Sequence, residues 1–519
     1  MKSLKSNQMN WKKWIKYTLI FLIVVTVAGI LGMTLEGKRM YGGLTERVDH
    51  TQFKPKEGSF AIRNVNLLSP DGDSIISGQT ILLEKGLIVA IDSTLNITSE
   101  TTIIDGTGKY LIPGLIDAHV HLFQSPNDLL LYIANGVTEI RELIGEEPHL
   151  EWKKEIENGR IGPKMFVASP RLGSFEPMEG WFMSWSQGYL NIENAEDARE
   201  TVKNLKDKGY DGLKIYSQLT KESYVALTEA ARSLEMPVMG HIPWSLELSD
   251  IWQHGQSDIA HFEEIMNALG REFGSSRNIG GFYGKENEFL QFIEERIDVL
   301  ANNLLKSDIT VTSSLWLNET FAKQPFELEQ VLKDVELAYE NPGISEWVSY
   351  IPQGLGWLPE VNRYRLPENQ SPEELERSKK YWDTYAKACQ LIAHNLAKRG
   401  VKIMAGTDAN LPPTVPGFSL HDELESLNRA GMSAAQVLQA ATAVPAAWLQ
   451  SNSGKIVPGY EANVLLLDKN PLEDIRNTKS INSVIVKGKL FDRALLNSLL
   501  AAVKEANDTS RKVAIDRYK

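Results

Sequence analysis

Short apolar runs alternate with helical patterns of apolar spacing through the middle of the chain. The runs begin near residues 111, 136, 164, 212, 238, 258, 309 and 401. Apolar runs of this length between turn residues are typical of buried parallel strands, and the segments between them have helical periodicity, as over 219–234. Repeated strand-then-helix units of this number predict an α/β fold, a (β/α)8 TIM barrel.

A different pattern flanks this middle region on both sides. Residues 60–113 and 452–495 consist of short strand-like runs separated by Gly, Pro, Asn and Asp. Within 60–91 we expect antiparallel strands with tight connections, and the run from Thr102 leads into the first barrel strand. Because the same pattern of short strand-like runs occurs at both ends, we predict one composite β-sandwich built from the two ends of the chain. The barrel is then expected to span 114–451.

One interval of the barrel is longer than its repeats require. His261 and Asp408 are 147 positions apart, whereas two β/α repeats need roughly 60 residues. Much of the excess lies in 321–387, where tryptophans stand among acidic residues, Pro and Gly. We predict a mostly helical insertion there on a barrel loop. Two interpretations remain open, a lid over the site or a surface helix pair.

The N-terminus carries a longer apolar run, from Tyr17 to Met33, preceded by five lysines: Lys2, Lys5, Lys12, Lys13 and Lys16. The run is near the lower length limit for a membrane-spanning helix. Lysines before it favour a cytoplasmic N-terminus and an exported remainder. We predict that residues 1–35 form an uncleaved transmembrane anchor with the catalytic domain extracytoplasmic. A cleaved signal peptide, giving a secreted protein, is the alternative.

Polar segments complete the predicted domain organisation. Residues 36–59 are polar and irregular and are expected to form a tether. Residues 496–519 are expected to form a polar tail, either helical or disordered. The length of 519 residues exceeds one compact core and agrees with several domains.

Composition and charge exclude some classes of protein. A net charge of -12 and a pI near 5.4 argue against a nucleic-acid binder, which would usually present a basic face. Cys389 is the only cysteine, which excludes intramolecular disulfides and Cys-rich metal sites. Any metal site must therefore use His, Asp, Glu or Lys.

Two histidines close the first barrel run, which reads Leu-Ile-Asp-Ala-His-Val-His from Leu115. His119 and His121 are two residues apart, so on a strand both imidazoles lie on one face. Two neutral imidazoles so placed can bind one metal ion. Taken alone, such a pair is more often two polar residues where a strand becomes a loop.

Four more candidate ligands stand at later strand ends: Lys214, His241, His261 and Asp408. In a barrel the carboxyl ends of the strands meet at one mouth, where active sites are built. We therefore expect all six side chains to converge on one or two divalent metal ions. Tyr216 shares a strand face with Lys214, and Arg141 could pair with a substrate carboxylate. Both are candidate substrate contacts, with a purely structural role as the alternative.

These motifs together resemble the amidohydrolase superfamily, in particular members similar to imidazolonepropionase and Xaa-Pro dipeptidase-like hydrolases. The resemblance covers about residues 60–493. It rests on the His119 motif, Leu213-Lys-Ile-Tyr, Ile259-Ala-His-Phe-Glu, Ala405-Gly-Thr-Asp-Ala and Leu420-His-Asp-Glu-Leu-Glu. It implies a metal-bearing barrel flanked by a β-sandwich, with zinc as the expected metal.

The resemblance also implies a role for each ligand. His119 and His121 would hold the first metal with Asp408 as a further ligand. A carboxylated Lys214 would bridge to a second metal held by His241 and His261. Asp408 would accept the proton of the attacking hydroxide and pass it to the leaving amine.

The implied activity is a metal-dependent hydrolase, in which metal-activated hydroxide cleaves a C–N bond of a small molecule or short peptide. The bond would be an amide, a peptide or a cyclic amide. A phosphoester or lactone hydrolase using the same site is one alternative, and a catalytically inactive membrane-anchored binding protein is another. The membrane is the expected partner of the N-terminal helix, and the sequence leaves an oligomer open.

Three departures from the family's pattern bear on the substrate and on stability. Asn463 stands where relatives usually have Asp, and Glu142 follows Arg141 where many have Asp. The loop 169–181 lacks the Gly-Gly-His that many relatives carry. That last difference alters the pocket and leaves the substrate open.

Overall fold

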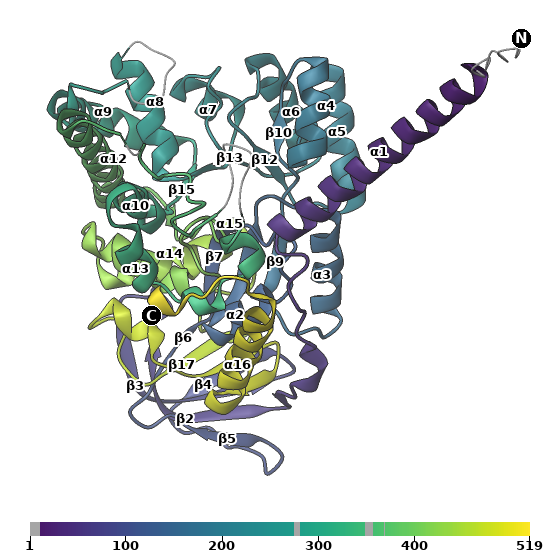
Figure 1. Cartoon of the computed structure of the whole chain (residues 1–519). Helices are drawn as coiled ribbons and strands as arrows, with labels where there is room; N and C mark the ends of the chain where they lie inside the picture. The colour runs from purple at the N-terminus through teal and green to yellow at the C-terminus, as the bar shows by residue number, and fades with distance from the viewer. Residues whose placement is uncertain (1–10, 275–280, 348–355, 368, 519) are drawn as a thin grey trace, which may run out of the picture.

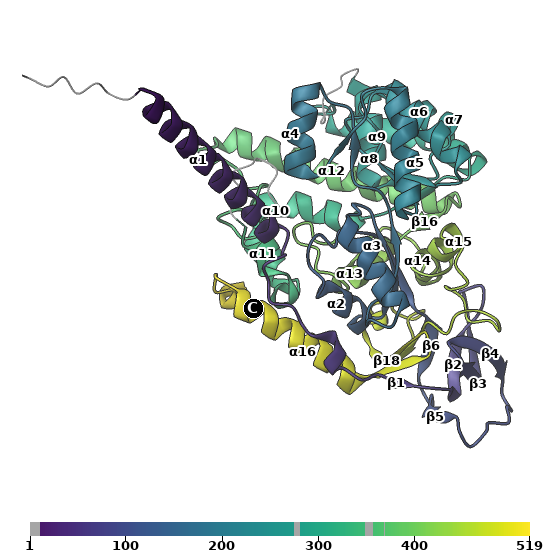
Figure 2. The ribbon, with the colours of Figure 1, turned by 90° about the vertical axis from the view of Figure 1, so that its right-hand side faces the viewer.

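The chain folds as a mixed α/β protein with a helix-covered part, a strand-rich part and one projecting N-terminal helix (Figure 1). The computed structural model describes residues 11–274, 281–347, 356–367 and 369–518. Lys2 and Lys5 of the predicted anchor lie outside these residues. The strand-rich part lies at the opposite end of the molecule from the free end of the projecting helix (Figure 2).

Each apolar run in the middle of the chain contains one strand. In chain order these are β7 (Leu115–Val120), β8 (Val137–Glu142), β9 (Lys164–Val167), β12 (Leu213–Ile215), β13 (Val238–Gly240), β14 (Asp258–Ala260), β15 (Thr310–Thr312) and β16 (Ile403–Met404). Neighbours pair in parallel along β7-β8-β9 and along β12-β13-β14-β15-β16. Isolated parallel bridges join Ala168 to Gly212 and Val120 to Ala409. The pairing therefore runs from β7 round to β16 and back to β7.

Helices connect and cover these strands (Figure 1). They are α2 (Asp128–Ala134), α3 (Glu147–Glu157), α5 (Ala195–Lys208), α6 (Lys221–Ser233), α7 (Leu248–His254), α8 (Phe262–Gly274), α9 (Glu286–Lys306), α10 (Leu315–Lys333), α12 (Pro372–Lys398), α13 (Phe418–Arg429), α14 (Ala434–Ala440) and α15 (Ala443–Trp448). Helix α6 confirms the helix expected over 219–234. Its bounds follow from capping: the Thr220 side chain accepts from the Ser223 N–H, which satisfies an otherwise unpaired donor.

Strands from both ends of the chain form one nine-stranded sheet. They are β1 (Lys56–Glu57), β2 (Phe60–Leu68), β3 (Ile75–Glu84), β4 (Leu87–Asp92), β5 (Thr102–Asp105), β6 (Tyr110–Pro113), β17 (Val464–Leu467), β18 (Ile481–Val486) and β19 (Lys489–Asp492). The two ends meet where β17 pairs with β6. The expected antiparallel order holds for β2-β3 and β3-β4. β5 and β6, whose direction the sequence does not predict, pair with β2 in parallel.

The apolar run at the N-terminus lies within α1 (Trp11–Met40). Within the part of the chain that the structure describes, one helix, Lys13–Met40, is long and apolar enough to cross a membrane. Its apolar window has a mean hydropathy of 2.5 and is not buried against the rest of the molecule. A signal sequence has the same features.

Residues 36–59, which the sequence predicts as a tether, contact the body of the protein at several points. Glu36 is still in α1 and accepts from the Trp347 indole N–H at 3.2 Å. The Tyr41 carbonyl accepts from the Gln124 N–H at 2.9 Å, and β1 pairs with β19. Although the segment is polar, its backbone and side-chain groups form hydrogen bonds with the body of the protein.

Most of the tail after residue 495 lies in a helix, α16 (Arg493–Ser510), which is the helical one of the two alternatives and is amphipathic. Leu496, Leu499 and Val503 are buried at helical spacing, and α16 packs beside α2. The apolar positions of α16 therefore form one face that packs on the body of the protein.

The insertion over 321–387 has helical ends and an irregular middle. α10 enters it and bends near Pro325, with non-helical backbone at Glu327. Its described middle consists of turns and the short helix α11 (Pro342–Ser345), and α12 leads out of it. The expectation of a mostly helical insertion is therefore correct for its ends only.

Candidate active site

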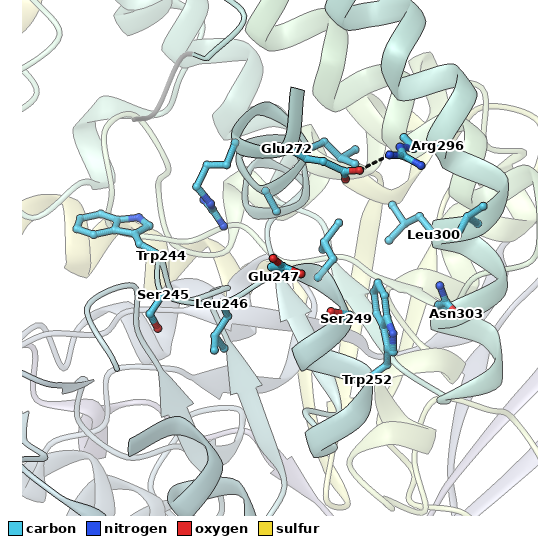
Figure 3. A pocket seen from close by; sticks show the side chains of 15 residues that line it. Trp244, Ser245, Leu246, Glu247, Ser249, Trp252, Glu272, Arg296, Leu300 and Asn303 are labelled. Atoms are coloured by element: carbon cyan, nitrogen blue, oxygen red, sulfur yellow. Dashed lines mark hydrogen bonds and ion pairs between the residues drawn. The ribbon is translucent and has the colours of Figure 1, made fainter. Parts of the chain in front are cut away.

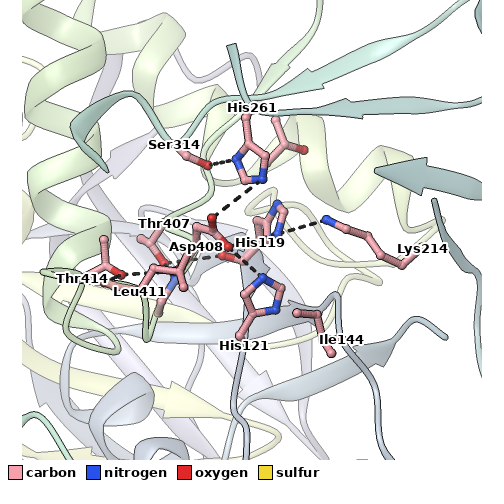
Figure 4. A network of polar contacts seen from close by, with 12 residues as sticks. His119, His121, Ile144, Lys214, His261, Ser314, Thr407, Asp408, Leu411 and Thr414 are labelled. Atoms are coloured by element: carbon pink, nitrogen blue, oxygen red, sulfur yellow. Dashed lines mark hydrogen bonds and ion pairs between the residues drawn. The ribbon is translucent and has the colours of Figure 1, made fainter. Parts of the chain in front are cut away.

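The six candidate ligands come from the carboxyl ends of five strands. Figure 4 shows five of them, all but His241, facing one region. His119 is in β7 and His121 follows it directly. Lys214 is in β12, while His241 and His261 each follow the last residue of β13 and β14. Asp408 lies in the turn after β16. Parallel strands place these ends side by side, which is why residues far apart in the sequence meet here.

Asp408 lies among three imidazoles. Its Oδ1 is 2.8 Å from His121 Nε2 and 3.3 Å from His119 Nε2. Its Oδ2 is 3.8 Å from His261 Nε2. On the other side of His119, the Lys214 Nζ lies 3.3 Å from Nε2. Each contact uses the Nε2 atom, so the imidazoles present the same nitrogen to one centre.

Polar side chains behind two of the imidazoles fix their orientation. The Ser314 Oγ lies 2.7 Å from His261 Nδ1. The Ser217 Oγ lies 2.9 Å from His241 Nδ1, and Glu264 Oε1 is 3.2 Å from the same atom. Partners on Nδ1 set the ring orientation and leave Nε2 for a ligand, as outer partners do in metal sites.

His241 and Tyr216 stack, with ring centroids 4.3 Å apart. The ring centroids of His241 and His261 are 5.4 Å apart. His241 is therefore beside the group around Asp408 but does not contact its carboxylate in the way that His121 does. Its side chain is also the more open, at 14% exposure.

The backbone at the site is strained in two places. His261 and Asp408 have positive φ, 69° and 58°, a region that side-chain-bearing residues rarely adopt. The strain at Asp408 is held by its N–H, which donates to the His119 carbonyl at 2.8 Å. Below it, the Thr407 hydroxyl donates to Asp117 Oδ2 at 2.7 Å. Strained backbone that surrounding bonds hold in place is common at functional sites.

Burial and charge shift the ionisation of the central groups. Burial lowers the pKa of the Lys214 ammonium to about 8. Burial opposes ionisation of Asp408, yet His261 and His121 beside it hold the pKa of its carboxyl well below its usual range. Burial and the Lys214 charge hold the pKa of His119 well below its usual range. Burial opposes a charge on His121, yet Asp408 and Glu142 beside it raise its pKa. The centre thus favours a carboxylate at Asp408 and a neutral imidazole at His119, the protonation states that metal ligands require.

The donor set fits a divalent metal ion. Among the described residues one group of His, Cys, Asp and Glu has ligand atoms within 4.8 Å of one another: His119, His121 and Asp408. The Asp408 Oδ1 atom is buried between His119 Nε2 and His121 Nε2. A buried carboxylate oxygen and imidazole nitrogens facing one point are the ligands of zinc-type sites.

Beside this group is a cavity of about 210 Å³. Five residues that line it were not among the candidate site residues and have charged or phenol side chains. They are Arg171, Glu263, Glu264, Arg363 and Tyr364. Tyr216, His121, His241, His261 and Asp408 also line it. Arg363 and Tyr364 come from the predicted insertion, so that segment contributes to the cavity wall.

The two candidate substrate contacts differ in position. Tyr216 lines the cavity, as its strand face predicts. Arg141 is not among the lining residues; it is fully buried, donates to Asp258 Oδ2 at 2.7 Å and lies over the Trp448 ring. The ion pair with Asp258 and the contact with Trp448 support the structural alternative for Arg141.

Sequence reasoning missed the two cavity arginines and the carboxylate behind His241. Glu264 follows His261 by one helical turn, a spacing that could have been found. Arg171 lies in the loop whose family motif is missing, and Arg363 lies in the insertion, so neither had a pattern to mark it. Glu142, noted only as a departure, accepts from the Ile144 N–H at 2.7 Å and lies 3.7 Å from His121 Nδ1.

A second cavity, of about 620 Å³, lies between α7, α8 and α9 (Figure 3). Trp244, Trp252 and Leu300 line it, and Glu272 pairs with Arg296 at its edge. None of the six candidate ligands is among its lining residues. Its size therefore does not make it the reaction site.

Comparison with known proteins gives a match to one family over part of the chain and a similar fold over most of it. Residues 371–491 match the Amidohydrolase family. Ochratoxinase of Aspergillus niger is 38% identical over 119 residues, which are 21% of this chain and 22% of that enzyme. The match thus spans about a fifth of the length of that curated relative.

Solved structures match over nearly their whole length. The bottromycin amidohydrolase has a TM-score of 0.63 at 21% identity, covering 90% of this chain and 96% of its own. A putative prolidase from Bifidobacterium longum has a TM-score of 0.59 at 23% identity, covering 86% of this chain and 100% of its own. At these identities the likeness concerns the fold.

Proposed function

We propose that the chain is a member of the amidohydrolase superfamily, a metal-dependent hydrolase that cleaves a C–N bond of a small substrate; the family match over residues 371–491 supports this. The observation that carries this is the meeting of His119, His121 and Asp408 at one buried point. A binding protein without catalysis has no need of a carboxylate so placed beside a cavity. The names of the similar enzymes, an amidohydrolase and a prolidase, agree with C–N hydrolysis.

We propose a (β/α)8 barrel over 114–451 as the scaffold of this site. The order of strand pairing and the two closing bridges support it. The flanking sheet of 60–113 and 452–495 is proposed as the companion β-sandwich. Its joining pair, β6 with β17, supports an origin from both ends of the chain.

One or two divalent ions, with zinc as the expected metal, are proposed at the barrel mouth. His119, His121 and Asp408 would hold one ion. Lys214, carboxylated on Nζ, would connect it to a second ion beside His241 and His261. A plain ammonium at this position would repel a cation, and burial already disfavours its charge. When bound, such an ion activates water and polarises the scissile carbonyl.

The residues of this chain supply proton transfer and orientation. Asp408 would accept a proton from the attacking water on its carboxylate and donate it to the leaving nitrogen as the C–N bond breaks. Its anionic state, held by His121 and His261, suits the first of these steps. The Ser314 and Ser217 hydroxyls would hold the imidazoles in place during the cycle.

We propose that the substrate carries a carboxylate next to the scissile bond. Arg171 and Arg363 both line the cavity and offer planar donor pairs that match a carboxylate. Tyr216 adds a hydroxyl on the same wall. A dipeptide or an N-acyl amino acid has both features, whereas a lactone or a phosphoester lacks the amide.

Hydrolysis assays on matched substrates test this proposal. We expect cleavage of dipeptides or N-acyl amino acids by the purified full chain, and much weaker turnover of their carboxylate-methylated forms. Turnover of phosphoesters or lactones alone would favour the alternative that the protein is a phosphoester or lactone hydrolase. Absence of turnover in all three classes by metal-loaded protein would favour a binding protein.

We propose that α1 anchors the protein in a membrane, with the catalytic domain outside the cytoplasm. Its exposed apolar run and the lysines before it support this topology. A reporter fused after Gly58 should be active only outside the cytoplasm. Cleavage of residues 1–35 in the mature protein would instead indicate a secreted enzyme.

A further inference from the structure

Helix α4 (Pro177–Gln187) carries its apolar side chains on the outside. Met178, Trp181, Phe182 and Trp185 are 83%, 69%, 48% and 45% exposed. They follow the i, i+3, i+4, i+7 spacing of one helical face, which we call the α4 patch. Trp181 and Trp185 stack with ring centroids 6.2 Å apart. A soluble helix would bury this face, and α4 instead turns Gly180 inward against Asn191.

The direction in which α1 projects indicates which surroundings the α4 patch faces. In both views α4 lies on the side of the body towards which α1 projects (Figures 1 and 2). The apolar run ends at Met33, and contact with the body begins at Glu36. These positions are separated by roughly 4.5 Å of helix rise. If α1 spans a bilayer, the side of the body facing along it reaches the headgroup region.

We propose that the α4 patch docks in the lipid–water interface of the membrane that α1 enters. Trp and other aromatic residues favour this depth, where their rings are partly wet and partly apolar. Residues 172–187 contain no Lys or Arg, so attraction to anionic lipid is not the driving force. Binding depends on buried apolar area, and it should persist at high salt. The proposal rests on the proposed membrane location of α1.

The docked helix is connected to the cavity. The Arg171 Nη1 donates to the carbonyl of Gln187, the last residue of α4, at 2.6 Å. Arg171 also lies over the Tyr189 and Tyr216 rings and lines the cavity. Arg171 therefore connects the helix that carries the α4 patch to the cavity in which we propose that substrate binds.

Site-specific lipid quenching tests the docking. Trp181→Cys in the full chain gives a labelling site for an environment-sensitive fluorophore, because Cys389 is buried. Ile103→Cys, 53% exposed on β5 at the opposite end, is the matched control, and Ile23→Cys, 61% exposed in α1, reports insertion. The protein is reconstituted in phosphatidylcholine vesicles with and without quencher-bearing lipid.

We expect quenching at positions 181 and 23 and none at 103, with no loss at high salt. Quenching at 23 but not at 181 overturns the docking and leaves the anchor intact. A blue-shifted but unquenched label at 181 would indicate a second copy of the chain on the patch, and also contradicts the proposal. Absence of quenching at 23 would remove both the anchor and the docking while leaving the proposed hydrolysis untouched.

Discussion

Asp408 is the residue on which the proposed chemistry depends most directly. Replacing it by Asn keeps an oxygen that can coordinate a metal but removes the proton acceptor. General acid–base help is worth ~10²–10⁴-fold, so we expect Asp408→Asn to lose about that factor in kcat while retaining most bound metal. Steady-state kinetics and metal analysis on one preparation measure both.

The surface variant Asp207→Asn, on α5, is the matched control and should behave as wild type. If Asp408→Asn keeps wild-type kcat with metal bound, Asp408 is not the proton carrier. If it loses all metal, its main role is as a ligand rather than a base.

Lys214 tests whether a bridging carboxylate holds the metals together. Lys214→Ala should lower metal occupancy, because the bridge disappears, and short-chain carboxylates should restore part of the activity. Surface Lys208→Ala is the control. Two retained metals and full activity in Lys214→Ala would show that the lysine has only a structural role.

At the scale of elements, the insertion contributes Arg363 to the cavity. Arg363→Gln should raise KM for carboxylate-bearing substrates and leave that for their methyl esters nearly unchanged. A charged hydrogen bond is worth about 1.5–3 kcal/mol, so kcat/KM should fall roughly 10–100-fold. Lys323→Gln, an exposed charge in the same insertion, should change neither value. Equal effects on acid and ester would rule out carboxylate recognition.

The N-terminal end of α10 rests on a buried carboxyl group. Glu423 accepts from the Leu315 and Trp316 N–H groups at 2.9 and 2.7 Å, and burial raises its pKa to about 7. The folded state therefore holds a proton that the unfolded chain has released above about pH 4.5. Stability contributed by this group is complete at low pH and declines as the pH rises towards 7.

Glu423→Gln cannot titrate and should remove this decline. The unfolding free energy of wild type relative to the variant should fall by about 3 kcal/mol from pH 4.5 to 7.5. Urea unfolding at several pH values measures the difference, with exposed Glu376→Gln as control. A difference that does not vary with pH would contradict the buried, protonated form of Glu423.

At the scale of the whole molecule, strand positions were predictable because short apolar runs between turn residues are typical of buried strands. The parallel pairing of β5 and β6 with β2 was not, because strand direction depends on connection geometry that composition does not encode. The packing of 36–59 and of α16 was missed for a similar reason: it depends on a few hydrogen bonds and on the buried Leu496, Leu499 and Val503.

The residues of the candidate site also divide into those that the sequence could predict and those that it could not. Ligands placed at strand ends could be found, since parallel strands bring those ends together. Arg171 and Arg363 could not, because loops carry no periodicity and their positions depend on tertiary packing. For Arg141 the sequence left a substrate and a structural role open, because it does not reveal the partner Asp258, which lies 117 residues away.

Metal analysis of the freshly purified full chain, paired with activity after chelation, tests the central claim most directly. We expect one or two equivalents of divalent metal, loss of C–N hydrolysis on chelation, and recovery when the metal is restored. A His119→Ala, His121→Ala double variant should neither retain the metal nor recover. Hydrolysis that continues unchanged after complete metal removal would contradict a metal-dependent hydrolase.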